Sequence, residues 1–78
     1  MYKNKAENGD NNIIGKKLKD YRKRLGLSQN GLAKLLQLEG LDIDKNAIQR
    51  IEARKRFVTD IEIHLICKVL HVTFEELV

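Results

Sequence analysis

Four polar residues near the middle of the chain are spaced so that one helix face would carry all of them. They are Lys45, Asn46, Gln49 and Arg50. Their offsets of one, four and five positions place all four around one exposed side of a helix. Asn and Gln can pair bidentately with adenine, and Arg or Lys with guanine. We therefore predict that these side chains contact base edges of double-stranded DNA; the alternative is an ordinary solvated polar face.

The helix predicted to begin at Ser28 has a first turn suited to binding a phosphate group. Ser28 is a good N-cap, and none of the three residues that follow it is acidic. The unpaired N–H groups at such a helix start therefore stay open to an anion. Gln29 can add its side-chain amide, so Ser28 and Gln29 are predicted phosphate contacts. The alternative is that Ser28 only caps the helix and Gln29 is solvated.

Charge is divided unevenly along the chain. The formal net charge is +4. Residues 13–58 contain twelve Lys or Arg against five Asp or Glu, a net +7, whereas residues 59–78 carry a net −3. A basic front and a mildly acidic back favour an oriented encounter with a polyanion. Charge alone leaves ordinary solvated surfaces as an equal alternative.

Apolar residues recur with a helical period from residue 13 onward. The predicted helices span residues 13–25, 28–38, 44–54, 59–70 and 73–77. The predicted N-caps are Ser28, Asp44, Thr59 and Thr73. The side chains expected to face inward are Ile14, Leu18, Tyr21, Leu25, Leu32, Ala33, Leu35, Leu36, Ala47, Ile48, Ile51, Ile61, Ile63, Ile66, Cys67, Leu70, Phe74 and Leu77. Residues 1–12 are predicted to form a flexible tail, which leaves residues 13–78 as the domain.

Two stretches of the sequence carry a resemblance to a known family. Gly26-Leu27-Ser28-Gln29 with Leu32-Ala33 is followed by Ala47-Ile48-Gln49-Arg50-Ile51-Glu52. Over residues 13–78 the chain resembles the phage-repressor/Cro (Xre-type) helix-turn-helix DNA-binding family. The resemblance implies an all-α, compact five-helix bundle of the lambda-repressor-like DNA-binding type, with the helix-turn-helix at helices 2 and 3. It also implies that the recognition helix, 44–54, enters the major groove.

The resemblance implies roles for further residues. Arg54, Lys55 and Arg56 stand where the family's basic loop grips the phosphate backbone. Arg22 and Glu52 stand where relatives have a structural ion pair, worth less than about 1 kcal/mol if it is exposed. The implied function is sequence-specific duplex binding by a cytoplasmic, prokaryotic or phage-type transcriptional regulator, with a repressor favoured. Relatives commonly dimerise to read two half-sites, so a homodimer is an implied arrangement.

Three departures from the family pattern bear on this interpretation. The link at residues 37–43 is longer than the family's tight turn, so the third helix is expected at an altered angle or the link in contact with DNA. Asp42 and Asp44 bring negative charge to the edge of the binding face. Asp44 is best explained as a cap, and the alternative is that its carboxylate accepts from cytosine. Arg54 occupies a position usually held by Gly, so we expect it to adopt a left-handed conformation at some cost.

Other chemistries are weighed and set aside. His64, Cys67 and His71 could share one helix face as metal ligands, but Cys67 lies on the apolar seam, so we predict no metal site. No nucleophile–base–orienter set and no Gly-rich phosphate cradle occur, so we predict no enzyme, cofactor or small-molecule substrate. No run of about 20 apolar residues occurs, which predicts no membrane contact. The single cysteine gives no internal disulfide, which fits a reducing cytoplasm.

The competing hypothesis is a protein-interaction or antitoxin-type module of the same fold. Such a module would use the face of helix 44–54 for a protein partner and should present exposed apolar residues there. The four polar residues on that face argue against it. Antitoxins of this family often bind DNA as well, so the two functions overlap.

Overall fold

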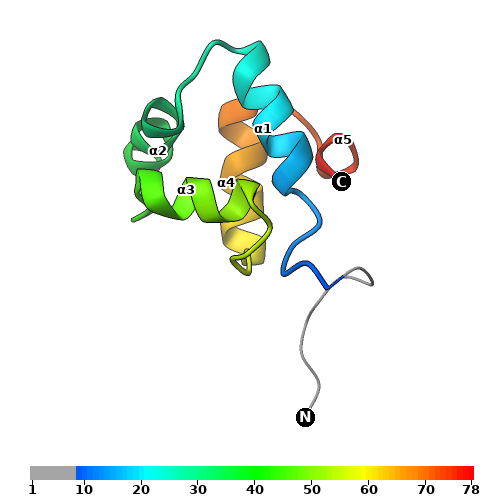
Figure 1. Ribbon diagram of the computed structural model, residues 1–78. Helices are drawn as coiled ribbons and strands as arrows, with labels where there is room; N and C mark the ends of the chain where they lie inside the picture. Colours follow the sequence, from blue (N-terminus) through cyan, green and yellow to red (C-terminus); the bar gives the residue numbers. More distant parts are fainter. Residues whose placement is uncertain (1–8) are drawn as a thin grey trace.

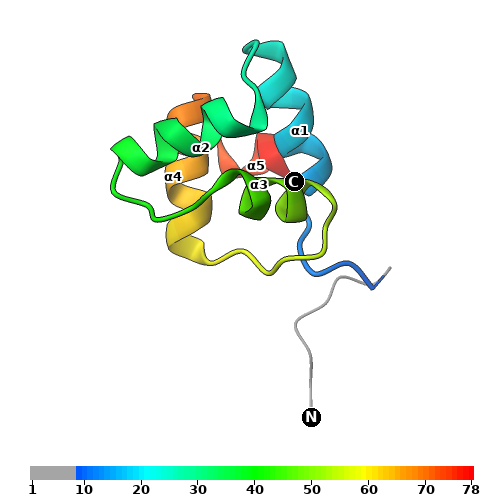
Figure 2. The ribbon, with the colours of Figure 1, turned by 60° about the vertical axis from the view of Figure 1, so that its left-hand side comes forward.

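Five α-helices and no strand make up residues 9–78, the part of the chain that the structure, a computed structural model, describes. They are α1 (Gly15–Arg24), α2 (Gln29–Leu38), α3 (Lys45–Glu52), α4 (Asp60–Leu70) and α5 (Phe74–Leu77). α3 lies between α1 and α2, with α4 behind it and α5 beside α1 (Figure 1; Figure 2). The predicted all-α five-helix bundle is confirmed. Within the same residues, no helix has the length and apolar character that a membrane crossing requires.

The helices α2 to α5 each begin at a side chain that accepts a hydrogen bond from the first turn, as predicted. These N-caps are Ser28, Asp44, Thr59 and Thr73. The last two belong to complete capping boxes, in which a glutamate returns a bond to the backbone of the cap residue. α1 begins differently, because the N–H groups of Ile14 and Gly15 donate to Asn12 Oδ1 at 3.2 and 2.9 Å.

Two helices end at residues in the left-handed region of backbone conformation. α3 ends at Glu52 because Arg54 turns to a φ of 61°, the conformation expected for this position. α4 ends at Leu70, and its C-cap, His71, has a φ of 56°. Both side chains carry a Cβ that crowds the backbone there, at about 1–2 kcal/mol each.

The core draws apolar side chains from all five helices and from the link before α3. The largest fully buried side chains are Ile14, Leu18, Leu32, Leu36, Ile48, Ile51, Ile66 and Leu77. The long link is anchored, because Ile43 is 3% exposed and its carbonyl accepts from Gln37 Nε2 at 2.7 Å. Of the other predicted core residues, several are partly buried: Tyr21, Leu35, Ala47, Ile63 and Cys67.

Three side chains predicted to face inward are exposed, so these predictions were wrong. Leu25 is 49% exposed because it caps α1 beyond its last inward-facing turn. Ile61 is 66% exposed because the first turn of α4 buries the carboxylate of Glu62, which an ion pair neutralises. Phe74 is 46% exposed because α5 has only four residues, of which Leu77 fills the core. The apolar period thus fails where helices start, end or are short.

The segment before α1 is bound to the loop after α3. Of the predicted tail, residues 1–8 lie outside the described part of the chain. Asn11 and Asn12 together donate four hydrogen bonds to backbone carbonyls between residues 51 and 56. Gly15 lies so close to the Ile51 carbonyl that no Cβ would fit. Sequence reasoning missed this attachment.

Replacing His71 by glycine is expected to stabilise the domain by about 0.5–1 kcal/mol. Glycine removes about 1–2 kcal/mol of strain from the left-handed backbone. It also raises the conformational entropy of the unfolded chain, which cancels up to about 1 kcal/mol of this gain. His71 is exposed, so little packing is lost. Urea unfolding followed by circular dichroism measures the change in unfolding free energy. His71→Ala keeps the Cβ and should gain nothing; an equal gain in both variants contradicts the strain argument.

Candidate nucleic-acid interface

α3 presents one face to the core and the opposite face to solvent. Ile48 and Ile51 are fully buried. The predicted base-reading residues are all exposed: Lys45, Asn46, Gln49 and Arg50. Within residues 9–78 none of these four side chains has a hydrogen-bonding or ion-pairing partner, so their polar groups are available to a ligand. Asp44 acts as the cap, accepting from the N–H of Ala47 at 2.8 Å, which explains a carboxylate at the edge of this face.

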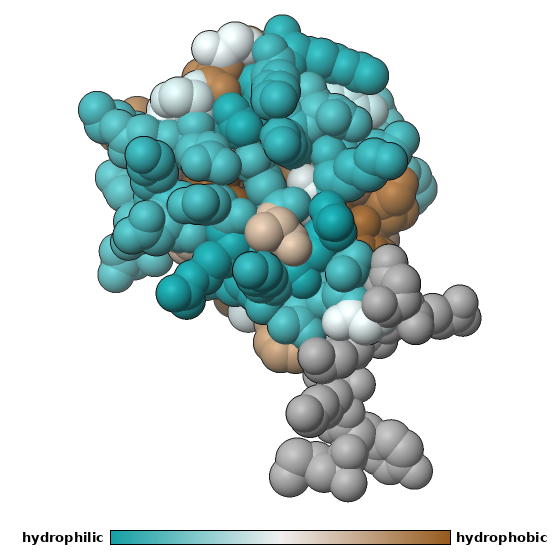
Figure 3. Space-filling view, viewed as in Figure 1, coloured by the Kyte–Doolittle hydropathy of each residue, from teal (hydrophilic) through white to brown (hydrophobic). Residues whose placement is uncertain are grey.

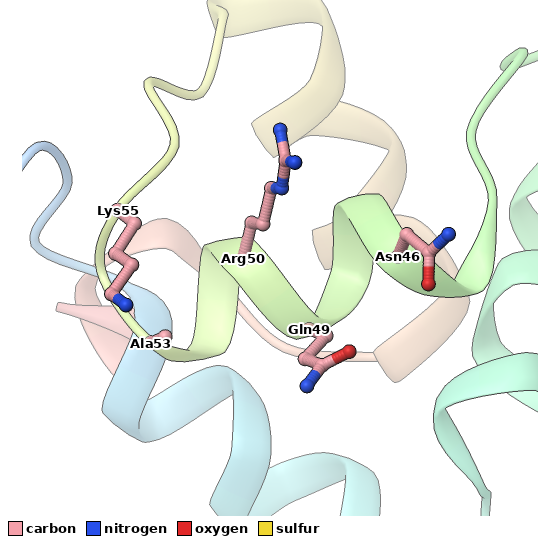
Figure 4. A pocket seen from close by; sticks show the side chains of 5 residues that line it. All are labelled: Asn46, Gln49, Arg50, Ala53 and Lys55. Carbon is pink, nitrogen blue, oxygen red and sulfur yellow. The ribbon is translucent and has the colours of Figure 1, made fainter.

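An open hollow brings part of this face together with the loop that follows α3. Its volume is about 540 Å³. It is lined by Asn46, Gln49, Arg50, Ala53 and Lys55 (Figure 4). Lys45, in the first turn of α3, does not line it. The hollow is open, and four of its five lining residues are polar. It therefore suits the edge of a large polar ligand better than a small molecule, because small molecules bind mostly in enclosed, apolar cavities.

The start of α2 combines the predicted cap with open backbone donors. Ser28 Oγ accepts from the N–H of Gly31 at 2.9 Å, and within residues 9–78 its own hydrogen has no acceptor and can donate. Neither Gln29 nor Asn30 has an acceptor for its backbone N–H in the described segment, and the first turn has no acidic residue. The side chain of Gln29 is engaged elsewhere, because Nε2 donates to Glu52 Oε1 at 3.1 Å. The group of Gln29 that is left to contact a phosphate is therefore its backbone N–H, not its side chain.

The three basic residues of the loop after α3 differ in what holds them. Arg54 Nε lies 2.9 Å from Asp10 Oδ2. Arg56 makes two hydrogen bonds of 2.9 Å to the carboxylate of Glu62. Lys55 is exposed and has no ion-pair partner among residues 9–78. Lys55 is thus the cation of this loop that is most available to a phosphate group.

The pair between Arg56 and Glu62 anchors the loop to α4. The hydrogen bonds from Arg56 hold the pKa of Glu62 below its ordinary value of 4.5, although burial of the carboxylate opposes this. The same bonds raise the pKa of Arg56. Glu62 also accepts from the N–H of Thr59 at 2.9 Å, so one carboxylate closes the capping box and holds the loop. Sequence reasoning missed this pair, because each residue already had a local explanation.

Arg22 and Glu52 form a buried, bidentate ion pair. The distances are 2.6 Å from Nε to Oε2 and 3.0 Å from Nη2 to Oε1, and the side chains are 9% and 4% exposed. Arg22 also donates to the carbonyl of Leu27 at 2.7 Å, and Gln29 donates to Glu52. The network joins α1, the turn before α2, α2 and α3. The predicted contribution of less than about 1 kcal/mol to stability was for an exposed pair. This pair is buried, so removing one partner leaves an uncompensated charge and costs more.

The face of the molecule that carries α1 and α3 is predominantly hydrophilic (Figure 3). Apolar surface appears at its right-hand edge, where α5 lies. The exposed large apolar residues of the described chain are Ile13, Leu25, Leu38, Phe57, Ile61, Phe74 and Val78. None of them belongs to α3, so the exposed face of α3 has no apolar patch.

The candidate metal ligands do not form a cluster. No group of three His, Cys, Asp or Glu residues within the described segment is placed to hold a metal ion. Cys67 packs against the core, and burial raises the pKa of its thiol, which disfavours the thiolate that metals bind. His64 and His71 are exposed.

A family model described as Helix-turn-helix matches residues 18–77. The matched segment contains α2 to α5 completely and α1 from Leu18 onward, so it includes the hollow, the basic loop and both partners of the buried ion pair. The matched segment begins after Asn11 and Asn12, the residues that bind the loop after α3. No curated protein matched the chain.

Breaking the buried pair from one side is expected to cost about 3–5 kcal/mol of unfolding free energy. Arg22→Met leaves Glu52 charged and buried, whereas adding Glu52→Leu removes both charges and should recover most of the loss. Lys68→Met breaks an exposed pair with Glu39, whose side chains are 61% and 31% exposed, and should cost less than about 1 kcal/mol. Urea unfolding compares all three variants with wild type. Equal small costs for Arg22→Met and Lys68→Met would contradict a structural role for the buried pair.

The pair between Glu62 and Arg56 makes stability depend on pH. Because folding lowers the pKa of Glu62, its carboxylate contributes stability that is fully present above pH 4.5 and is lost as the pH falls through the lowered value. Glu62→Gln should therefore cost about 1 kcal/mol at neutral pH and progressively less on acidification. Unfolding curves at a series of pH values measure the difference, with exposed Glu75→Gln as control. A cost that stays constant below pH 4.5 would contradict this account.

Proposed function

Because the chain belongs to the Xre-type, lambda-repressor-like helix-turn-helix family, we propose that it binds double-stranded DNA sequence-specifically and acts as a transcriptional repressor of prokaryotic or phage type. α3 is the recognition helix, and it lies in the major groove with its exposed face toward the bases. The observation that carries this proposal is the face itself, where four polar side chains are exposed and none has a partner within residues 9–78.

The side chains of α3 suit particular bases. Asn46 and Gln49 each offer one donor and one acceptor, which match the major-groove edge of adenine. Arg50 and Lys45 offer only donors, which match the two acceptors of guanine. The open hollow between Asn46 and Lys55 leaves room for a base edge to approach. α3 therefore has both the chemistry and the access that direct reading of a duplex needs.

Phosphate contacts on two sides of α3 would set its depth and register in the groove. On one side, the start of α2 offers the hydroxyl of Ser28 and the open N–H groups of its first turn. On the other side, Lys55 extends from the loop as a cation with no ion-pair partner among residues 9–78. Arg54 and Arg56 retain guanidinium N–H groups beyond those used by their carboxylate partners, so they support the same backbone contact less directly.

A protein partner fits the exposed face of α3 less well than DNA does. The core of a protein interface is depleted in charged residues and enriched in aromatic ones. The exposed side of α3 carries two cations and two amides. The exposed aromatic residues of the described segment, Phe57 and Phe74, lie outside α3. An interaction module of the antitoxin type is therefore the second candidate.

Selection of bound duplexes from a random pool tests the proposal and supplies the preferred site. We expect one enriched family of sequences. Two inverted half-sites about one helical turn apart would indicate the implied homodimer, which stays a prediction. A pool that binds but stays random would contradict sequence-specific reading. Failure to bind any duplex at low salt would contradict DNA binding itself.

Base-reading and phosphate-binding residues should differ on two kinds of duplex. Arg50→Ala and Asn46→Ala are each expected to weaken binding to the selected duplex by about 1–3 kcal/mol and to leave binding to a mixed-sequence duplex nearly unchanged. Lys55→Ala should weaken both alike and reduce the salt slope by about one unit. The reason is that base edges differ between sequences whereas phosphates do not. Fluorescence anisotropy at several salt concentrations measures all the affinities.

A charge-matched control separates local contacts from the overall charge of the protein. Lys68→Ala also removes one positive charge, but from α4, where Lys68 pairs with Glu39 at the end of α2. It should leave both affinities and the salt slope nearly unchanged. If Arg50→Ala and Lys55→Ala behave identically on the two duplexes, α3 does not read bases.

A further inference from the structure

Every hydrogen-bonding position of the Asn12 side chain is occupied. Oδ1 accepts from the backbone N–H groups of Ile14 and Gly15 at 3.2 and 2.9 Å, at the start of α1. Nδ2 donates to the carbonyl oxygens of Ile51 and Arg56 at 3.1 and 2.8 Å. A single amide group therefore ties the start of α1 to the last turn of α3 and to the far side of the basic loop.

The neighbouring asparagine holds the carbonyls in between. The N–H of Asn11 donates to the carbonyl of Arg54 at 2.9 Å, and its Nδ2 donates to that of Lys55 at 2.7 Å. Three carbonyl oxygens of the loop and one in the last turn of α3 are thus engaged by the segment before α1. Carbonyl oxygens carry partial negative charge and would repel a phosphate group. Because they are occupied on the inner side, the loop can offer the cation of Lys55 on its outer side.

The loop needs this outside support because it contains little regular structure of its own. It runs from the end of α3 at Glu52 to the start of α4 at Asp60. It contains Arg54, which is held in the left-handed region at a φ of 61°. The supporting segment precedes residue 18, where the family match begins. The attachment is therefore a feature of this chain that the matched family model does not cover.

We propose that Asn12 is a positioning residue for DNA binding, whose amide holds the loop after α3 in the shape that presents Lys55 to a phosphate group. This inference rests on the proposed function and deepens it. Asn11 is the weaker of the two anchors, because its buried Oδ1 has no hydrogen-bond partner in the part of the chain that the structure describes.

Asn12→Ser separates the two halves of the Asn12 contacts. A serine hydroxyl can still cap the start of α1, but it is too short and has too few hydrogens to hold the carbonyls of both Ile51 and Arg56. Serine adds no charge near the DNA, whereas aspartate would. Thr73→Ala is the matched control, because it removes the N-cap of α5 and so lowers stability without touching the loop.

A double-mutant cycle between Asn12 and Lys55 tests the inference. Affinities for mixed-sequence duplex DNA are measured from about 50 to 200 mM salt, where circular dichroism shows each variant to be folded. Lys55→Ala should weaken binding about fivefold to tenfold near 0.1 M salt and lower the salt slope by about one. Asn12→Ser should reproduce most of both effects, and combining the two should add little. Thr73→Ala should leave affinity and slope unchanged.

The outcomes separate this inference from the proposed function. If Asn12→Ser leaves the slope unchanged, or if its loss simply adds to that of Lys55→Ala, Asn12 does not position Lys55, although the proposed function stands. If the wild-type protein binds no duplex, the proposed function fails and the inference fails with it. Should Asn12→Ser unfold, Asn11→Ala enters the same cycle, with a smaller non-additive loss expected and an additive one overturning the inference.

Discussion

The orientation of α3 depends on two charges that are almost completely removed from water. Arg22 of α1 and Glu52 at the end of α3 have side chains that are 9% and 4% exposed. Charges in such a place are stable only while paired, and the bidentate geometry of the pair restricts how its partners can be placed. The carbonyl of Leu27 accepts from Arg22 and the amide of Gln29 donates to Glu52, so the turn before α2 and α2 itself are both tied to the ion pair. The network thereby fixes α3 relative to α2, the relation on which a helix-turn-helix depends.

The supports of α3 are concentrated at its C-terminal end. There the buried pair holds Glu52, Asn12 holds the Ile51 carbonyl, and the loop beyond is tied to α4 through Arg56. At the other end, the cap Asp44 and the buried link residue Ile43 provide the attachment. Because the surroundings of the hollow are already ordered, less conformational entropy is lost when a ligand binds there. In the loop itself, Asn11 and Asn12 engage the carbonyls of Arg54, Lys55 and Arg56 in hydrogen bonds.

Local rules predicted most of the fold, and long-range contacts account for what they missed. N-caps such as Ser28 act on residues three positions away, so a single sequence reveals them. The apolar period predicted the core but not the exposure of Ile61, because an inward carboxylate one residue later decides the orientation of that turn. The contacts of Asn12 join residues 39 and 44 positions apart, and no pattern in one sequence marks such a pairing. The pairing of Arg22 with Glu52 was predicted from the family resemblance. Its burial depends on how the helices pack, which the sequence does not reveal.

Amide chemical-shift mapping during titration with the selected duplex tests most directly the claim that the exposed face of α3, held by the buried ion pair, meets DNA. The account predicts that the largest changes occur along α3, in the loop at Lys55 and at the start of α2. It predicts little change in α5 and in the shallow hollow between α2 and α4 that Leu38 and Val69 line. Large changes in α5 or in that hollow, with α3 unaffected, would contradict the account.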